Sequence, residues 1–197
     1  MDPIEHPVVK HSYTTTVSGV NVYAPGSFFV SQVRLSDIMV GLAKICRFNG
    51  QIDRFYSVAE HSVWVSHIAE VEGDEDAIIP ALFHDAHETY SGDYPSPQKD
   101  MVPELRPFED SYELVVREAL GLPDSQDPVW WRVRQYDTLI LHRELKALRR
   151  VLPDWYDPSL ERLVPASVQP VGFEWQEAQA FFRARLHDLG IGLGGSA

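Results

Sequence analysis

The pattern of apolar and polar residues changes once along the chain, near residue 36. Before that point β-branched and polar residues mix without a helical period, and the segments 14–17 and 20–23 flank Ser18-Gly19, which predicts a hairpin with a two-residue turn. After it, apolar residues recur at the three- and four-residue spacing of amphipathic helices. The pattern predicts an all-α domain over 36–189, an N-terminal extension with the hairpin over 1–35, and a flexible Gly-rich tail over 190–197.

Start and stop signals divide the helical part into six predicted helices. The clearest start is the S-x-x-E capping box of Ser57 and Glu60. A loop with Pro95 and Pro97 and an irregular stretch over 154–172 interrupt the helices. Their expected bounds are about 36–48, 57–70, 74–91, 107–120, 127–152 and 174–189.

Composition narrows the class of protein. The 197 residues suit one domain, and 44% apolar with 23% charged residues excludes a disordered or fibrous chain. A net charge of −12 argues against duplex nucleic acid or an anionic membrane as the main partner. The single Cys46 forms no internal disulfide, and no apolar run approaches the length of a membrane span. With no signal peptide recognisable, we expect a cytoplasmic enzyme, or one in the host cytoplasm if a virus encodes it.

The dipeptide His-Asp occurs twice, and the residues around its two copies differ. His187-Asp188 falls in the last turn of the final predicted helix, where a histidine is ordinary, and we expect a structural role. His84-Asp85 follows apolar residues, and Glu88 lies one turn further on the same side of the predicted helix. This pair either coordinates a metal or forms a buried hydrogen bond where helices cross.

Two further polar residues fall on apolar helix faces. His61 shares its face with apolar residues of the second predicted helix, and Asp137 lies within the apolar stripe of the longest one. A histidine of this kind is often satisfied by a backbone carbonyl, whereas a buried aspartate needs a partner. Together with His84 and Asp85 they form a ligand set for a divalent transition metal, Zn, Co or Mn.

Several segments around these residues carry a family resemblance over roughly residues 36–150. The order of His61, His84-Asp85 and Asp137 resembles the H…HD…D signature of the HD-domain metal phosphohydrolases, in particular the YfbR-like 5′-deoxynucleotidases and the related viral dATP triphosphohydrolases. Thr89 stands where the (p)ppGpp hydrolases of this superfamily carry an acidic residue, which counts against that branch. The resemblance implies an HD-domain helical bundle. The segments that carry the resemblance are CRFNG at 46–50, FYSVAEHS at 55–62, HDAHE at 84–88, GDYPSPQK at 92–99, and Tyr136-Asp137.

The resemblance also implies roles for individual residues. His61, His84, Asp85 and Asp137 would hold the metal, which makes a water acidic enough to attack a phosphoester at neutral pH. Glu88 is similar to the catalytic carboxylate of the family, which orients or deprotonates that water.

Other residues are implied in substrate binding and catalysis. Arg47 resembles the phosphate-binding arginine, and Lys99 is placed to reach the same phosphates. Phe48 stands where the family usually has a tryptophan that crowds the sugar 2′ position, and Asp93 would bind the 3′ hydroxyl. A base would stack between Phe48 and the Pro95–Pro97 loop, which brings Pro97 into the site. The alternatives are a helix-terminal charge for Arg47, a solvated Lys99 and a core position for Phe48.

These observations predict a hydrolase that attacks the α-phosphorus of a 2′-deoxynucleoside 5′-phosphate ester. The first choice is dATP, cleaved to deoxyadenosine and triphosphate, with Arg54 and Lys99 as candidate cations for the additional phosphates. The alternatives are a 5′-deoxynucleotidase acting on dNMPs, a non-catalytic nucleotide-binding HD module, and a structural helical protein with buried His–Asp pairs. We expect a small deoxynucleotide as partner, no nucleic acid or membrane, and a homo-oligomer.

Overall fold

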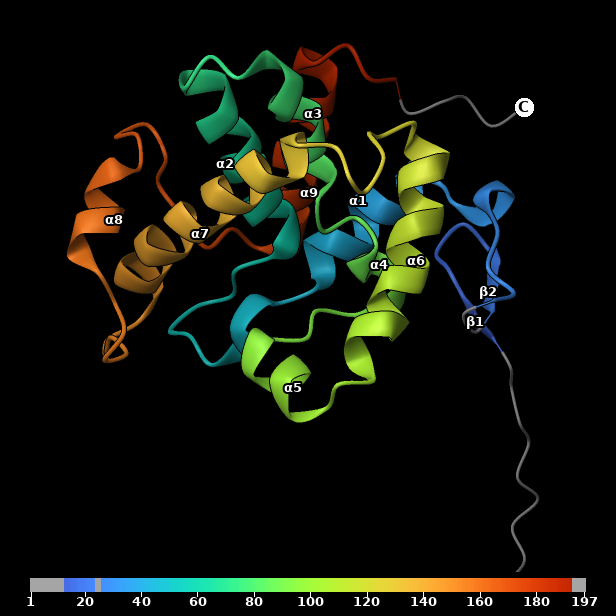
Figure 1. Cartoon of the computed structure of the whole chain (residues 1–197), viewed down its shortest axis with the longest axis horizontal. Helices are drawn as coiled ribbons and strands as arrows, with labels where there is room; N and C mark the ends of the chain where they lie inside the picture. Colours follow the sequence, from blue (N-terminus) through green and yellow to red (C-terminus); the bar gives the residue numbers. More distant parts are fainter. Residues whose placement is uncertain (1–12, 24–25, 193–197) are drawn as a thin grey trace, which may run out of the picture.

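The computed structural model describes residues 13–23 and 26–192, which fold into α-helices with one small hairpin (Figure 1). The predicted all-α architecture with a short N-terminal hairpin is confirmed. The elements are β1 (Tyr13–Thr15), β2 (Asn21–Tyr23), the 3-10 helix η1 (Val30–Gln32), α1 (Leu35–Lys44), the 3-10 helix η2 (Arg47–Gly50), α2 (Val58–Val71), α3 (Glu75–Phe83), α4 (Glu88–Ser91), α5 (Ser96–Met101), α6 (Leu105–Leu120), α7 (Val129–Leu148), α8 (Pro158–Leu163) and α9 (Trp175–Asp188).

The hairpin has a longer turn than its sequence predicts. β1 and β2 pair antiparallel, with Thr14 opposite Val22, and the amide of Thr16 donates to the carbonyl of Val20 over 2.9 Å. Three residues therefore form the loop instead of two, and Gly19 closes it at a φ of +85°, where a side chain would be strained. The amide and hydroxyl of Ser18 both donate to Asp37, which attaches the loop to the first turn of α1.

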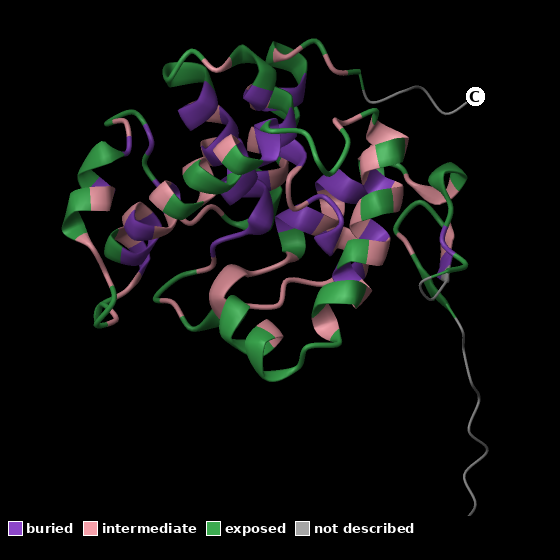
Figure 2. Cartoon of the chain, in the orientation of Figure 1, coloured by how far each residue is buried: buried purple, intermediate pink, exposed green. Residues whose placement is uncertain are grey.

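Helix α2 lies at the centre of the bundle, in contact with α1, α3, α7 and α9. One face packs Val63 into a cluster with residues of α1, α6 and α9, and another packs Val65 and Ile68 against α3 and α7. Figure 2 shows the buried positions concentrated in these central helices, while α5 and α8 are largely exposed. Because α2 is enclosed on several sides, a polar residue in its first turns lies inside the core.

Several predicted helix bounds are wrong. The first helix ends at Lys44, since Cys46 pairs with Ser57 in an antiparallel bridge. The third breaks after Phe83, because Ala86 and Glu88 donate to carbonyls three residues back, and α4 starts separately. The fourth begins at Leu105 instead of Pro107, and the longest ends at Leu148. The stretches expected to be loops contain α5 and α8.

Other predicted features are confirmed. The hydroxyl of Ser57 accepts a hydrogen bond from the amide of Glu60 and caps α2. Helix α9 has the expected bounds within one residue at each end. Residues 190–192 continue past α9 without helical structure, and the rest of the predicted tail and residues 1–12 of the extension lie outside the described residues. Within the described part, no helix is both long and apolar enough to span a membrane.

The second half of the predicted capping box does not form. The carboxylate of Glu60 instead accepts hydrogen bonds from the amides of Val171, Gly172 and Phe173, at distances of 2.7 to 3.2 Å. A carboxylate from α2 thus satisfies the backbone that leads into α9.

Candidate metal centre

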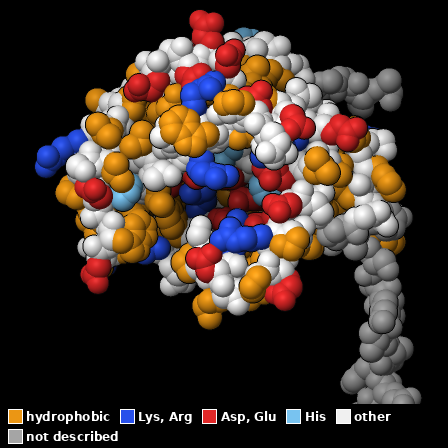
Figure 3. Space-filling model, viewed as in Figure 1, with side chains coloured by type: hydrophobic (Ala, Val, Ile, Leu, Met, Phe, Trp, Pro, Cys, Tyr) orange, Lys and Arg blue, Asp and Glu red, His pale blue; other side chains and the backbone are white. Residues whose placement is uncertain are grey.

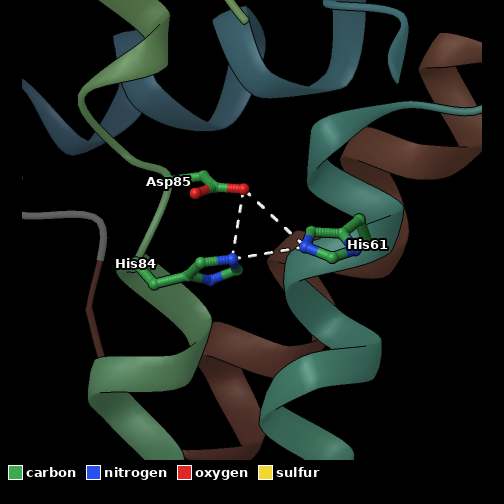
Figure 4. Close-up of side chains that lie close together, drawn as sticks. All are labelled: His61, His84 and Asp85. Atoms are coloured by element: carbon green, nitrogen blue, oxygen red, sulfur yellow. Dashed lines mark hydrogen bonds and ion pairs between the residues drawn. The ribbon is translucent and has the colours of Figure 1, made fainter. Parts of the chain in front are cut away.

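Three of the four predicted metal ligands, His61, His84 and Asp85, come together, and the fourth, Asp137, contacts His61. The Nε2 atom of His61 on α2 lies 3.2 Å from Nε2 of His84 and 3.7 Å from Oδ2 of Asp85, which both follow α3 (Figure 4). His84 Nε2 and Asp85 Oδ2 are 3.1 Å apart. Asp137 on α7 places its Oδ1 atom 3.1 Å from His61 Nε2.

These separations suit donors that share one ion. Two ligand atoms about 2.1 Å from an ion lie about 3.0 Å apart at a right angle and about 3.4 Å apart at a tetrahedral angle. The separations here run from 3.1 to 3.7 Å. The imidazole nitrogens of His61 and His84 and a carboxylate oxygen of Asp85 form a donor group that suits Zn, Co or Mn, and the Asp137 carboxylate lies next to His61, so the residues fit the predicted metal.

The two histidines are oriented by bonds on their other ring nitrogens. Nδ1 of His84 lies 2.8 Å from the carbonyl oxygen of Ala81, and this contact requires a proton on Nδ1. Nδ1 of His61 lies 2.6 Å from Oε1 of Glu144. Both bonds aim Nε2 into the site, the arrangement that metal-binding histidines usually have.

Glu144 is a site residue that the sequence reasoning missed. It is fully buried on α7, accepts a hydrogen bond from the Tyr56 hydroxyl over 2.8 Å, and places Oε2 3.5 Å from the Arg47 guanidinium. Burial acts to raise the pKa of Glu144, but Arg47 and His61 outweigh it and lower the pKa below its ordinary value. The signal was available, because Glu144 follows Asp137 by seven residues, two turns along the same face of one helix.

Arg47 reaches the centre from the segment that joins α1 to α2. The Cys46–Ser57 bridge and a 2.9 Å bond from the Arg47 amide to the Tyr56 carbonyl hold this segment against the start of α2. The guanidinium lies 3.5 Å from Oδ2 of Asp85, and its Nε atom is buried without a hydrogen-bond partner in the described structure. Arg47 is thus a cation beside the predicted metal ligands, and its Nε atom has hydrogen-bonding capacity left over.

Phe48 lies in an uncommon backbone conformation next to Arg47. Phe48 and Asn49 have φ values of +58° and +51°, left-handed conformations that side chains rarely adopt. The Phe48 ring centre lies 5.6 Å from the Arg47 guanidinium and 5.2 Å from that of Arg149, a second residue that the sequence reasoning missed. Phe48 is half-buried, and its predicted stacking against Pro97 stays a prediction, since Pro97 is exposed on α5.

Glu88 is a buried carboxylate with no side-chain hydrogen bond or ion pair among the residues that the structure describes. It is 4% exposed, and its Oε2 atom is buried and unsatisfied. Burial, together with the carboxylates of Asp85 and Asp93, raises the pKa of Glu88 well above its ordinary value. The predicted single helix over His84 and Glu88 is wrong, since Glu88 begins α4 after the turn.

The remaining predicted residues differ in their availability. Burial raises the pKa of Asp93, which is half-buried beside Glu88, although Arg47 acts in the opposite direction. The ammonium of Lys99 on α5 lies 2.9 Å from Oε1 of Glu109. Arg54 donates to the backbone carbonyls of Val171 and Ala147, so it serves the fold instead of a substrate.

One face of the molecule is hollowed. Figure 3 shows a hollow in the middle of this face, with basic side chains around it and acidic and histidine side chains within it. In the view of Figure 1 it lies between α7 and α5.

The second His-Asp pair is exposed, unlike the pair at His84 and Asp85. The side chains of His187 and Asp188, in the last turn of α9, are 90% and 68% exposed.

Comparisons with known proteins give relatives and no family model. No protein-family model matches the chain. It is 35% identical over 130 residues to the uncharacterized protein YfdR of Escherichia coli, which covers 66% of this chain and 68% of that protein. It is 30% identical over 167 residues to an uncharacterized protein of Rhodobacter capsulatus, covering 80% of this chain and 85% of the relative. The chain belongs to the protein family of Escherichia coli YfdR.

Proposed function

We propose that the chain is an HD-type metal phosphohydrolase that cleaves a 2′-deoxynucleoside 5′-phosphate ester at the α-phosphorus. The observation that supports it best is the convergence of His61, His84 and Asp85 within 3.1 to 3.7 Å, with Asp137 3.1 Å from His61. A bound divalent ion makes a water acidic enough to attack phosphorus and offsets phosphoryl charge.

Residues of the chain supply the rest of the chemistry. Arg47 binds the phosphoryl oxygens through its free Nε and forked guanidinium. Glu88 takes a proton from the attacking water, a role that suits a buried carboxylate whose pKa is raised. As the bond between phosphorus and the 5′ oxygen breaks, Glu88 returns this proton to the 5′ oxygen and the deoxynucleoside leaves.

Sugar recognition falls to two residues near Arg47, namely Phe48 and Asp93. Phe48, held by the left-handed turn, crowds the 2′ position and favours deoxyribose. Asp93 accepts a hydrogen bond from the 3′ hydroxyl, and it has no hydrogen bond within the described part of the chain that would compete.

Our first candidate substrate is dATP, released as deoxyadenosine and triphosphate, and the second is a dNMP. The dNMP candidate gains support because two of the predicted phosphate-binding cations are already engaged within the protein. Lys99 is engaged by Glu109, and Arg54 is engaged by backbone carbonyls, so fewer positive charges are free for a triphosphate than the sequence indicates.

A product assay tests the proposal. Purified protein with Mn²⁺, Co²⁺ or Zn²⁺ is offered dNMPs, dNTPs and rNTPs, and the released nucleoside and phosphate species are measured. Triphosphate release from dATP supports the first candidate, and orthophosphate release from dNMPs alone supports the second. Nucleotide binding without turnover overturns the hydrolase in favour of a binding module.

A variant pair tests the catalytic carboxylate. Glu88→Gln should keep fold and the ion at the His61 centre but lose at least ~10²-fold in turnover, the usual scale for a general base. Glu118→Gln, an exposed glutamate on α6, is the matched control and should keep full activity. A fully active Glu88→Gln protein would remove this residue from the mechanism.

A further inference from the structure

A second group of potential metal ligands lies beside the first centre. A ring nitrogen of His87 and carboxylate oxygens of Glu88 and Glu109 lie within 4.8 Å of one another. The three residues are 8%, 4% and 5% exposed, so the group is buried between α4 and α6. None of them belongs to the four ligands of the His61 centre.

This group lacks the partners that buried polar atoms normally have. Nδ1 of His87 and Oε2 of Glu88 are buried without a hydrogen bond in the part of the chain that the structure describes. The ammonium of Lys99, on Glu109, is the one ion-pair partner that the described residues provide. Buried carboxylates and imidazoles are normally paired or bound to a metal, so a cation is the natural missing component.

The group opens on a cavity of about 230 Å³ whose charges favour a cation. Two of its lining residues are engaged by acidic or basic neighbours, Arg106 by Asp100 and Glu113 by Arg117. Among the lining residues, that leaves the single charge of Lys99 against the carboxylates of Glu109 and Asp110. An anion such as a phosphate group would meet net repulsion there, and a divalent cation would meet attraction.

We propose that His87, Glu88 and Glu109 form a second divalent-cation site that binds a transition metal such as Mn²⁺, with the cavity admitting water as further ligands. One imidazole and two carboxylates are a donor set that Mn²⁺, Co²⁺ and Zn²⁺ accept. The ion replaces the Lys99 ammonium as the counter-charge of Glu109. Glu88 would give one carboxylate oxygen to this ion and keep the other for the proton transfer of the proposed function. The site stands on its own contacts and does not require that the chain hydrolyse nucleotides.

Metal stoichiometry tests the site without turnover. Equilibrium dialysis against Mn²⁺ alone should give two ions per wild-type chain, and one in either His87→Ala or Glu109→Gln. The control Glu118→Gln, on the same helix as Glu109 but exposed, should keep two. His84→Ala should lose the ion of the first centre and keep the second.

Either of two results overturns the second site: one ion in the wild type, or two ions in Glu109→Gln. A wild type with two ions and no nucleotide turnover would instead overturn the hydrolase proposal alone, and an active protein with one ion would overturn the second site alone.

The variant Lys99→Met keeps all three proposed ligands, so it tests the site even if the ligand variants fail to fold. It should bind the second ion at least tenfold more tightly than the wild type, because the competing ammonium is removed from Glu109. Unchanged affinity in this variant would overturn the site.

Discussion

Nδ1 of His61 lies 2.6 Å from Oε1 of Glu144, and both side chains are fully buried. Glu144 also receives the Tyr56 hydroxyl and faces the Arg47 guanidinium. One carboxylate therefore orients a predicted metal ligand and a predicted phosphate-binding residue. Helix α7 carries both Glu144 and Asp137. It therefore holds a predicted metal ligand, Asp137, and the carboxylate that orients His61 and Arg47.

Removing this carboxylate should weaken metal binding without removing a ligand. We expect Glu144→Ala to lower the affinity for Mn²⁺ at the His61 centre about 10- to 100-fold, the usual effect of losing such an orienting partner. Glu144→Gln keeps an oxygen for Nδ1 and should lose less. Titration of the ion into each variant checks this, and equal affinities in Glu144→Ala and wild type would contradict the positioning role.

The two His-Asp pairs provide an internal comparison. His84→Ala and Asp85→Ala should each remove the ion from the first centre and abolish any turnover, because each deletes one of the three converging donors. His187→Ala and Asp188→Ala alter exposed side chains and should retain both. Metal content per purified chain decides, and equal content in all four variants would overturn the metal centre.

Periodic patterns carried most of the fold prediction. The apolar stripe of 174–189 predicts α9 almost to the residue, since that helix packs one face on the core. The breaks were not visible in the pattern. The end of α1 depends on the Cys46–Ser57 bridge, and the end of α3 depends on tight turns in a segment whose composition is helical.

The site was predictable where residue types are unusual for their surroundings. His61 and Asp137 stand out because each interrupts an apolar face. Glu60 shows the limit, because its spacing from Ser57 predicts a local capping role. Its carboxylate instead bonds to backbone amides more than 110 residues further along the chain, and such a partner cannot be inferred from local spacing.

Asp74 connects the first turn of α3 to α7 and should make stability depend on pH. Its carboxylate accepts two bonds from Arg132, at 2.6 and 3.2 Å, and one from the Tyr136 hydroxyl at 3.0 Å. The hydrogen bond from Arg132 lowers the pKa of Asp74 below 3.8, although burial acts in the opposite direction. Because the pKa of Asp74 is lower in the folded state, its ionised carboxylate stabilises the fold at pH values above the ordinary pKa of an aspartate. This contribution is lost as the pH falls through the pKa of the folded state.

Asp74→Asn should therefore lower the Tm by a few degrees at pH 7, and the difference from wild type should shrink below about pH 3.8. Asp76→Asn, at an exposed position in the same turn, is the control and should change little. Thermal denaturation followed by circular dichroism across pH checks this. A difference that is constant with pH would show that charge on Asp74 is not the cause.

Arg149 and Arg150 are neighbours with opposite surroundings, and they form the last test. Arg150 is 85% exposed and pairs with Asp53 over 3.0 Å. Arg149 lies over Phe48, and its Nε atom is buried without an acceptor in the described structure. No carboxylate of the described residues engages Arg149, although the chain has 29 acidic and 17 basic residues, and we predict that the ligand supplies its acceptor.

If the substrate supplies that acceptor, Arg149→Ala removes a charge-assisted hydrogen bond worth about 1.5–3 kcal/mol, or about 10- to 150-fold in kcat/KM. Arg150→Ala should leave kcat/KM within twofold of wild type. Nucleotide binding to Glu88→Gln, with and without Arg149→Ala, separates a lost contact from a disturbed reaction step. Equal affinities in these two proteins would assign Arg149 to support of the Phe48 turn, and the loss of kcat/KM would then be matched by Phe48→Ala.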